Sequence, residues 1–587
     1  MEVKRLFDLL EYRKNTTPDR PVFAAKREGK WEEFKIDEYI EMSDSISYGL
    51  LAMGLQPGEK VALISSNRPE WNFLDMGVQQ MGGILVPIYP TISEDDYKYI
   101  LSNAAVKFIF LEGPELLRKI RNILPELPNV QKIYTFKKRD EQTSDFAELV
   151  ELGKANPAPE RLKGIKDSIK PKDMVTMIYT SGTTGMPKGV MLSHENIIFN
   201  FMGVRETPKP YFSRTMSFLP LCHVYERMMN YFYQFAGYET FYAENMGKVV
   251  DNIAEVKPHL MCSVPRFLEK IYDKIYRKGE KMKGIKKKLF YKTLDLATEY
   301  DLDKRSLWYK LKWKIADRIT YRKIRESFGG CLEMIVSGGA GIQPRLASFF
   351  TCIGMCIYEG YGLTETSPVI AVSNSAKNGR KIGTAGPPLP GVEVRIDPET
   401  KEILCRGKNV MLGYYQAPEL TKEVIDADGW FHTSDTGELL PTGQLKITGR
   451  TKTMFKTSMG KFVNPEVIEE KFKESPFILE MMVVGEGQKF AAALIAPDFE
   501  FLKDWQCRHG INCQTREEMV ADKQTLERYK RVMAKYNSYF GETEQVKKFK
   551  LLTDTWSEAN GLITPTLKIK RKKVAERYSQ EIENLFK

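Results

Sequence analysis

The chain of 587 residues has no apolar run approaching the roughly 18 residues that a transmembrane helix needs. Its first residues, Met1-Glu-Val-Lys-Arg-Leu6, lack the basic-then-apolar pattern of a signal peptide. Eight scattered cysteines form no disulfide framework, which favours a reducing compartment. We therefore expect a cytoplasmic protein, with peripheral attachment to the cytoplasmic face of a membrane as the alternative.

Histidine is also scarce: the chain has five, and none has a convincing partner for a catalytic triad. Cys507, His509 and Cys513 offer only three ligands at irregular spacing, which favours two thiols and a surface histidine over a zinc site. Internal repeats and low-complexity segments are absent. A chain of this length exceeds one hydrophobic core, so we expect two or more domains.

One stretch is rich in what phosphate binding needs: Tyr179-Thr-Ser-Gly-Thr-Thr-Gly-Met-Pro-Lys-Gly-Val190. It follows a predicted buried strand, Met174-Val-Thr-Met-Ile178. Glycines allow close backbone approach, and hydroxyls with a lysine complete an anion cradle. A Walker A loop is excluded because Pro187, rather than glycine, precedes Lys188. The alternative is a polar surface turn between a strand and a helix.

Strands and helices alternate through residues 1–170, which predicts a mostly parallel sheet covered by helices. The expected strands are 61–65, 84–88, 108–110, 216–219 and 332–336, and the expected helices are 37–53, 68–81 and 94–104. Residues 381–450 are β-rich and predict a small barrel or sheet, whereas 498–540 are helix-rich. The fold class is therefore α/β, with a large multi-layer N-terminal domain over 1–449, a hinge at 450–453 and a smaller α/β domain over 454–587.

Four further stretches follow the glycine loop in order: Tyr358-Glu-Gly-Tyr-Gly-Leu-Thr-Glu-Thr366, Thr433-Ser-Asp-Thr-Gly437, Gly449-Arg450 with Lys452, and Pro565-Thr-Leu-Lys568. In order and spacing, the five motifs resemble the adenylate-forming superfamily of acyl-CoA synthetases, luciferases and peptide-synthetase adenylation domains. The resemblance covers essentially the whole chain.

The resemblance implies an ATP site with Mg²⁺, a cation that prefers oxygen ligands. The phosphates would be held by the glycine loop, whose residues are Thr180, Ser181, Gly182, Thr183, Thr184, Gly185 and Lys188. Thr180 and Glu365 would hold the metal. Tyr361 would stack on adenine, in a motif that also supplies Gly362 and Thr364, and Asp435 would bind the ribose, followed by Arg450 on the ribose and phosphate side.

The resemblance also implies two steps, in which a carboxylate displaces pyrophosphate from ATP and a thiol then displaces AMP. Lys568 would stabilise charge in the first step; Lys570 competes for that role, because Leu567-Lys568 replaces the Gly-Lys pair of many relatives. The C-terminal domain would rotate between the steps about Lys452, where many relatives have Asp. Gly460 would line the tunnel for the pantetheine arm of CoA.

The acid is indicated by Leu219-Pro-Leu-Cys-His-Val-Tyr-Glu-Arg227, which resembles the long-chain branch. His223 would lie at the acyl carboxylate, with a core histidine as the alternative, and Gly338, Gly339 and Ala340 would place thin backbone against the acid. The aromatic residues over 225–235 either wall an acyl channel or belong to the core. With Lys568, Lys188, Glu365 and His223 as the catalytic set, these residues predict ATP-dependent conversion of long-chain fatty acids to acyl-CoA.

Three alternatives stay open: an acyl-AMP ligase that loads a carrier protein, a luciferase-like oxygenase, and a non-catalytic acyl- or nucleotide-binding regulator. Against the last, a decayed site should have lost some of the motif residues, and this chain keeps them. We expect fatty acid, ATP and CoA as partners and no nucleic acid. The sequence does not predict the oligomeric state or the preferred acyl chain length.

Nearly all of the net charge of +11 lies in residues 269–326, which hold 19 Lys and Arg against 9 Asp and Glu. Trp308, Leu311, Ile315 and Ile319 fall at helical spacing among these basic residues. An apolar stripe beside a basic face suits an anionic membrane surface. The same stripe equally suits a helix packed on the body, and the charge could also serve CoA, which is a polyanion.

Overall fold

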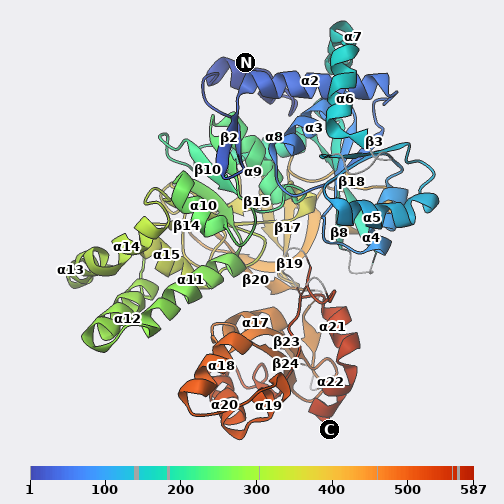
Figure 1. Cartoon of the computed structure of the whole chain (residues 1–587). Coiled ribbons are helices and arrows are strands. Elements are labelled where there is room, and N and C mark those ends of the chain that lie inside the picture. The colour runs from blue at the N-terminus through green and yellow to red at the C-terminus, as the bar shows by residue number, and fades with distance from the viewer. Residues whose placement is uncertain are drawn as a thin grey trace.

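The computed structural model describes residues 2–137, 144–181, 186–302, 305–451, 453–458, 461–557, 560–564 and 569–587, leaving out the side chains of Ser181 and Phe462. A large α/β body carries the N-terminus, and a smaller α/β body carries the C-terminus (Figure 1). The predicted fold class is thereby confirmed. The exact domain and hinge boundaries stay a prediction. None of the described helices combines the length and the apolar character needed to cross a bilayer.

The first sheet of the body has eight strands in the order β18-β9-β8-β4-β3-β5-β6-β7. Its strands β3 to β6 and β8 run parallel, and β9 returns antiparallel to β8. The strands are β3 (Lys60–Ile64), β4 (Ile84–Pro87), β5 (Val106–Leu111), β6 (Lys132–Thr135), β7 (Ser144–Asp145), β8 (Met174–Ser181), β9 (Pro187–Ser193) and β18 (Gly413–Tyr414). The helices of this part are α2 (Ile36–Ala52), α3 (Pro69–Gln80), α4 (Glu94–Asn103), α5 (Pro114–Ile123), the 3₁₀ turn η1 (Leu124–Glu126), α6 (Phe146–Ala155) and α7 (Pro159–Ser168).

The second sheet also has eight strands, in the order β15-β14-β13-β12-β10-β11-β1-β2. From β1 to β14 its neighbouring strands run parallel. The strands are β1 (Phe23–Arg27), β2 (Lys30–Phe34), β10 (Arg214–Ser217), β11 (Glu239–Tyr242), β12 (Leu260–Ser263), β13 (Met334–Ser337), β14 (Cys356–Gly362) and β15 (Val369–Val372). The predicted strand 216–219 ends two residues early, because the chain leaves the sheet before Pro220, which has no N–H to donate.

Helices link and cover this second sheet. They are α1 (Asp8–Thr16), α8 (His194–Val204), α9 (Val224–Phe235), α10 (Val249–Val256), α11 (Pro265–Glu280), α12 (Gly284–Thr298), α13 (Leu307–Ala316), the π-helical turn η2 (Asp317–Tyr321), α14 (Arg322–Ser327), α15 (Pro344–Cys352) and the 3₁₀ turn η3 (Thr364–Thr366). Helices α12 and α13 project from the body, on the left of Figure 1. This projection falls within the basic segment 269–326.

The segment 381–450, which was predicted to be β-rich, forms a four-stranded antiparallel sheet. This half-barrel has the strand order β16-β17-β19-β20. Its strands are β16 (Glu393–Ile396), β17 (Glu402–Arg406), β19 (Phe431–Leu439) and β20 (Leu445–Arg450), with helix α16 (Pro418–Val424) between them in the chain. The expectation of a small β-unit at this place is confirmed.

The C-terminal domain has its own buried clusters around the three-stranded sheet β23-β24-β25. Its strands are β21 (Phe455–Lys456), β22 (Phe462–Val463), β23 (Ile478–Val484), β24 (Ala491–Pro497) and β25 (Val546–Leu551). Its helices are α17 (Pro465–Phe472), α18 (Phe499–Arg508), α19 (Arg516–Ala521), α20 (Lys523–Asn537), α21 (Arg571–Arg577) and α22 (Ser579–Phe586). The helix-rich passage predicted near 498–540 corresponds to α18 to α20.

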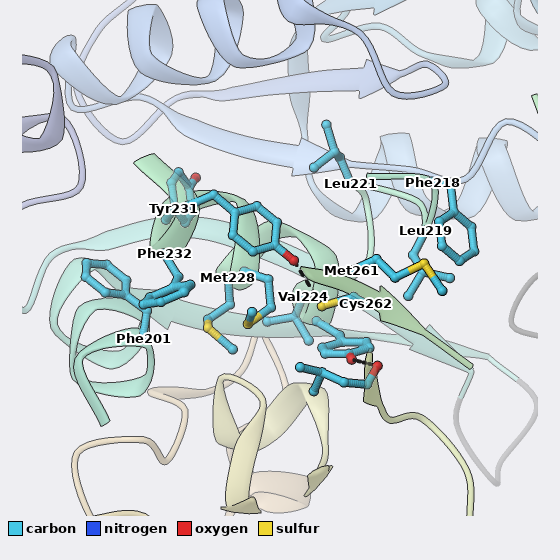
Figure 2. Packing of buried hydrophobic residues seen from close by; sticks show 14 of the residues in the cluster. Phe201, Phe218, Leu219, Leu221, Val224, Met228, Tyr231, Phe232, Met261 and Cys262 are labelled. Carbon is cyan, nitrogen blue, oxygen red and sulfur yellow. Dashed lines mark hydrogen bonds between the residues drawn. The ribbon is translucent and has the colours of Figure 1, made fainter. Parts of the chain in front are cut away.

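Helix α9 lies in the largest buried cluster, together with Met261 and Cys262 of β12 (Figure 2). Its aromatic residues Tyr231, Phe232 and Tyr233 are at most 1% exposed, as expected if they belong to the core. The sequence left open whether they wall an acyl channel, and this packing favours the core alternative.

A buried ionic network ties α9 to its neighbours. The Arg227 guanidinium lies 2.6 Å from Oδ1 of Asp75 on α3 and donates a 2.6 Å hydrogen bond to Oγ1 of Thr176 on β8. It also donates to the Tyr231 hydroxyl at 3.0 Å. Such charges tolerate burial only when paired and hydrogen-bonded. The network therefore fixes α9, and the loop before it, relative to the strand that leads into the glycine loop.

Candidate active site

Most of the predicted site residues follow the carboxyl ends of neighbouring parallel strands. The chain leaves β10 toward His223, β13 toward Gly338, and β14 through Gly362 toward Glu365. In open α/β sheets, ligands bind outside the carboxyl ends of the strands. The second sheet therefore gathers the predicted acyl residues and the motif of Tyr361 and Glu365 at one edge.

The glycine loop joins β8 to β9, two antiparallel strands, rather than a strand to a helix. Thr180 on β8 stands opposite Lys188 on β9, so the lysine belongs to a strand instead of closing the loop. This register brings a predicted metal ligand and a predicted phosphate ligand to the base of one hairpin. The side chain of Ser181 and the predicted Gly182, Thr183, Thr184 and Gly185 lie outside the described residues.

Lys188 and Glu365 are linked through a residue that the motifs did not reveal, Tyr414. The Tyr414 hydroxyl donates a 2.8 Å hydrogen bond to Oε1 of Glu365, and Lys188 Nζ lies 5.1 Å from the centroid of the Tyr414 ring. Burial, and then the negative charge of Glu365, raise the pKa of Tyr414. The phenol therefore stays protonated and acts as a donor that orients the carboxylate.

Tyr361 and Arg450 meet on the carboxylate of Asp435. The Tyr361 hydroxyl donates to Oδ2 at 2.8 Å, and Arg450 Nε lies 2.9 Å from Oδ1. Asp435 and Arg450 are direct cross-strand partners on β19 and β20, and Asp435 is only 3% exposed. Burial, and then the charge of Asp435, raise the pKa of Tyr361 well above its usual range. The half-barrel thus places Asp435, which is predicted to bind the ribose, against Tyr361, which is predicted to stack on adenine.

The turn after Tyr361 requires its glycine. A Cβ atom on Gly362 would lie 1.7 Å from the Pro368 carbonyl oxygen, where no side chain fits. Thr364 begins the 3₁₀ turn that carries Glu365. The chain therefore folds back at the end of β14, where Gly362 packs on Pro368. The 3₁₀ turn that carries Glu365 lies between these two residues.

His223 caps α9: its Nδ1 accepts a 3.1 Å hydrogen bond from the Tyr225 backbone N–H. With Nδ1 as an acceptor, a neutral imidazole carries its proton on Nε2. His223 is half-buried and its Nδ1 bond is made within the chain, so its role at the acyl carboxylate stays a prediction beside the alternative of a core histidine. Its other ring nitrogen is chemically suited to donate to a carboxylate.

The loop after β13 lies against the same end of α9. A Cβ on Gly338 would lie 3.3 Å from the Tyr225 ring, and the Tyr225 hydroxyl donates to the Val336 carbonyl oxygen at 3.0 Å. Gly339 has φ +81°, a left-handed conformation that favours glycine. Ala340 follows in this loop. The predicted acyl residues, His223 and 338–340, are therefore brought together by Tyr225.

The remaining predicted residues Lys452, Gly460 and Lys568 lie outside the described residues. Near the last of these, Ile563 and Ile569 form an antiparallel bridge, and the Lys570 N–H donates to the Leu562 carbonyl oxygen at 2.9 Å. The assignment of adenylation to Lys568, with Lys570 as its competitor, stays a prediction.

Comparison with known proteins identifies the family. The model of the AMP-binding enzyme family matches residues 10–415, and that of the AMP-binding enzyme C-terminal domain matches 453–587. A long-chain-fatty-acid–CoA ligase of Mycobacterium bovis, FadD15, is 32% identical over 577 residues, covering 97% of this chain and 95% of the relative. The peroxisomal long chain acyl-CoA synthetase 6 of Arabidopsis thaliana is 32% identical, covering 92% of this chain and 80% of the relative.

Solved structures share the fold at lower identity. The adenylation domain of a carboxylate reductase from Mycobacterium chelonae has a TM-score of 0.77 at 20% identity, covering 99% of this chain and 91% of that one. ATP-bound MatB from Rhodopseudomonas palustris has a TM-score of 0.71 at 21% identity, covering 99% and 100%. The chain belongs to the AMP-binding enzyme family, in its long-chain fatty acid–CoA ligase branch.

Proposed function

We propose that this chain converts long-chain fatty acids to acyl-CoA in two steps, with ATP and CoA as co-substrates. A carboxylate oxygen attacks the α-phosphorus of ATP, the bond to the β-phosphate oxygen breaks, and pyrophosphate leaves. The CoA sulfur then attacks the acyl carbon, the bond from that carbon to the phosphate oxygen breaks, and AMP leaves while the thiol proton passes to solvent. The proposal rests on the contacts that Tyr361 and Arg450 make with the Asp435 carboxylate, next to the motif that contains Glu365.

The nucleotide half is supported by the charges at the base of the glycine hairpin. Lys188 supplies a fixed cation, while Tyr414 keeps Glu365 oriented by its 2.8 Å hydrogen bond. Preorganised charges of this kind stabilise a transition state because they need no rearrangement as its charge develops. No protein nucleophile is needed for either step.

Magnesium fits the oxygen ligands present here. The described residues hold no group of three His, Cys, Asp or Glu that could cage a metal ion. Mg²⁺ suits such a site, because it commonly takes one or two protein oxygens together with water and substrate phosphates. We propose that Glu365 and the Thr180 hydroxyl hold it, where it would neutralise phosphate charge.

The acyl half is supported by the end of α9 and the loop after β13. His223 offers an imidazole whose Nδ1 is already engaged, and Gly338 packs closely on the Tyr225 ring, whereas the position of a Cβ on Gly339 has only Val264 within 4 Å. A fatty acid carboxylate placed there would lie beside the His223 imidazole and thin backbone. The long-chain preference rests on the relatives, which are named long-chain ligases or synthetases.

The rival functions make different products. A carrier-loading acyl-AMP ligase would release AMP only with a carrier protein, a luciferase-like enzyme would consume oxygen with acyl-AMP, and a binding regulator would make no pyrophosphate. Pyrophosphate release, measured across acids from acetate to oleate with and without CoA, separates them. We expect acid-dependent pyrophosphate, highest with long chains, and AMP release that requires CoA, with Lys568→Ala as the inactive control. No acid-dependent pyrophosphate at any chain length would overturn the proposal.

We also propose that the enzyme docks on an anionic membrane through α13. The stripe predicted from the sequence does not hold α13 to the body: Trp308, Leu311, Ile315 and Ile319 are 74%, 50%, 53% and 37% exposed. The opposite face attaches the helix instead. There Trp313 donates to the Cys352 carbonyl oxygen at 2.9 Å and Tyr309 to the Leu296 carbonyl oxygen at 2.8 Å.

The exposed stripe therefore favours the membrane over packing on the body. Leu307 on α13 and Ile285 on α12 are also exposed apolar residues, at 82% and 85%. Lysines flank it on α13 at positions 310, 312 and 314. Each basic residue near an anionic surface contributes about 1 kcal/mol, and buried apolar side chains add to this. A fatty acid partitions into membrane, so an enzyme that collects it there has a physical reason to dock.

A further inference from the structure

One face of α11 reaches across to the C-terminal domain. Arg266 Nη2 donates to the Leu479 carbonyl oxygen at 3.2 Å and lies 3.6 Å from Oε1 of Glu480. Arg277, further along the helix, lies 3.4 Å from Oδ2 of Asp498. Eleven residues separate the two arginines, about three turns of an α-helix, so both project from the same face.

Two further contacts extend this face. Glu280, at the end of α11, pairs with Arg508 of α18 at 3.1 Å, with the charges reversed relative to the arginine contacts. Arg345 of α15 donates to the Glu474 carbonyl oxygen at 3.3 Å. The body thus holds the C-terminal domain by polar contacts spread along one helix and its neighbour.

In the inner pair Glu480 is buried and Arg266 is half-buried, and both partners have a second charge in their own domain. Glu480 is 5% exposed and lies 3.6 Å from Lys473, which belongs to the C-terminal domain. Arg266 lies 3.1 Å from Glu269 on its own helix. Burial acts to lower the pKa of Arg266, but the charges of Glu480 and Glu269 raise it overall. Separating the domains therefore leaves neither charge unpaired.

This double pairing suits a contact that is broken repeatedly. Breaking a buried ion pair is costly mainly because it leaves one charge buried and uncompensated. Here Arg266 keeps Glu269 and Glu480 keeps Lys473. At the outer contact, Asp498 also caps α18, accepting from the Phe501 N–H at 2.9 Å. The contacts can therefore hold the C-terminal domain without making its release prohibitive.

The orientation held in this way places α17 over the acyl loop. The Glu470 carboxylate lies 3.6 Å from the position that a Cβ would take on Gly341, directly after residues 338–340. The contacts of α11 thereby set how the C-terminal domain meets the predicted acyl site. The resemblance to adenylate-forming enzymes implies that this domain rotates between the two steps, and such a rotation has to break these contacts.

We propose that α11 is a catch, formed by Arg266, Arg277 and Glu280, that holds the C-terminal domain in one of its two working orientations. The inference rests on the proposed two-step function and adds to it the residues that set the balance between the steps. These are positioning residues, since they touch neither substrate nor reacting atoms. Weakening the catch shifts the domain toward the other orientation, so one half-reaction gains while the other loses.

The first test measures shape without activity. Small-angle X-ray scattering of the ligand-free full chain compares wild type with the double variant Arg266→Glu, Arg277→Glu. We expect the variant to have a changed inter-domain scattering profile with an unchanged circular dichroism spectrum. Lys274→Glu, an exposed charge reversal on the same helix, serves as the control and should match wild type. Superimposable profiles for the double variant and wild type would overturn the catch.

The second test uses the reversed pair. Glu280→Arg and Arg508→Glu should each shift pyrophosphate exchange and thioester formation from supplied oleoyl-AMP in opposite directions, by about fivefold. Combining them restores the pair and should restore both rates. Equal losses in both half-reactions, or no rescue, would contradict the catch. If wild type makes no acid-dependent pyrophosphate while scattering still shifts, the proposed function fails, whereas the finding that α11 holds the C-terminal domain stands.

Discussion

The Tyr361 hydroxyl donates a hydrogen bond of 2.8 Å to the carboxylate of Asp435, which lies 74 residues later in the chain. The bond joins the end of β14 in the second sheet to β19 in the half-barrel. It closes the nucleotide site across two sheets, because Arg450 holds the other carboxylate oxygen at 2.9 Å. Each of the three side chains therefore constrains the other two.

Removing this bond should weaken ATP use specifically. A hydrogen bond to a charged group is worth about 1.5–3 kcal/mol, so Tyr361→Phe should lower kcat/KM for ATP by at least about tenfold. Steady-state kinetics with ATP and oleate varied separately checks this, and the KM for oleate should stay close to wild type. Tyr358→Phe, which removes a hydroxyl 3.1 Å from Ser375 instead, is the matched control. Equal behaviour of the two variants would contradict the role of Tyr361.

Tyr414 should control the metal and phosphate end of the site. Tyr414→Phe keeps the ring under Lys188 but removes the donor to Glu365, so we expect it to raise the Mg²⁺ concentration needed for half-maximal pyrophosphate release. Tyr414→Leu also removes the cation–π contact, which is worth about 0.5–1 kcal/mol and adds a further loss of roughly two- to fivefold. An unchanged Mg²⁺ dependence in Tyr414→Phe would show that Glu365 needs no such donor.

Sequence alone indicated most of the sheet and the nucleotide motifs, because periodicity and glycine placement are local signals. It missed Tyr414, which lies 49 residues from Glu365 and joins it only when β18 pairs with β9. It also could not decide the environment of the stripe on α13. Helical spacing shows which residues share a face, but only the packing of Tyr309 and Trp313 shows which face is turned inward.

The α11 contacts were likewise beyond the sequence. The partner of Arg266, Glu480, is more than two hundred residues away, in another domain. Among the many basic residues of 269–326, the sequence does not show that Arg277 pairs with a residue of another domain. Geometry separates Arg266 and Arg277, which bind the C-terminal domain, from the exposed lysines of α13.

Stability should fall with rising pH because of Glu226. Burial raises the pKa of this carboxyl to about 8, from an ordinary value of 4.5. Between these values the folded chain keeps a proton that the unfolded chain has released, so stability declines as the pH rises through the window and levels off above about 8. Glu226→Gln should be more stable than wild type, by a margin that grows from pH 5 to 8. If the thermal unfolding midpoints of wild type and Glu226→Gln change in parallel with pH, this prediction is contradicted.

The buried Arg227–Asp75 pair predicts an asymmetric response to mutation. Arg227→Ala leaves Asp75 charged and buried, and should cost about 3–5 kcal/mol in the free energy of unfolding. Replacing both residues, with Arg227→Met and Asp75→Leu, removes the stranded charge and should recover much of that loss. Urea unfolding followed by tryptophan fluorescence checks both. A double variant as unstable as Arg227→Ala would contradict the account of the pair.

Membrane docking predicts separable apolar and ionic contributions. Trp308→Ser with Leu311→Ser and Ile315→Ser, or neutralisation of the α13 lysines 310, 312 and 314 to Gln, should each reduce sedimentation with phosphatidylglycerol vesicles. Turnover of a short, soluble acid should not change. Lys530→Gln with Arg531→Gln, exposed charges on α20, is the control. Unchanged sedimentation in both α13 variants would rule out this surface.

In the proposed reaction, AMP departs with an oxygen atom from the fatty acid. Oleate labelled with ¹⁸O in both carboxylate oxygens, incubated with ATP, Mg²⁺, CoA and the full chain, tests it by mass spectrometry of the AMP formed. Adenylation followed by attack of the thiol at the acyl carbon predicts one ¹⁸O in each AMP. Unlabelled AMP formed along with oleoyl-CoA would contradict an acyl-AMP intermediate.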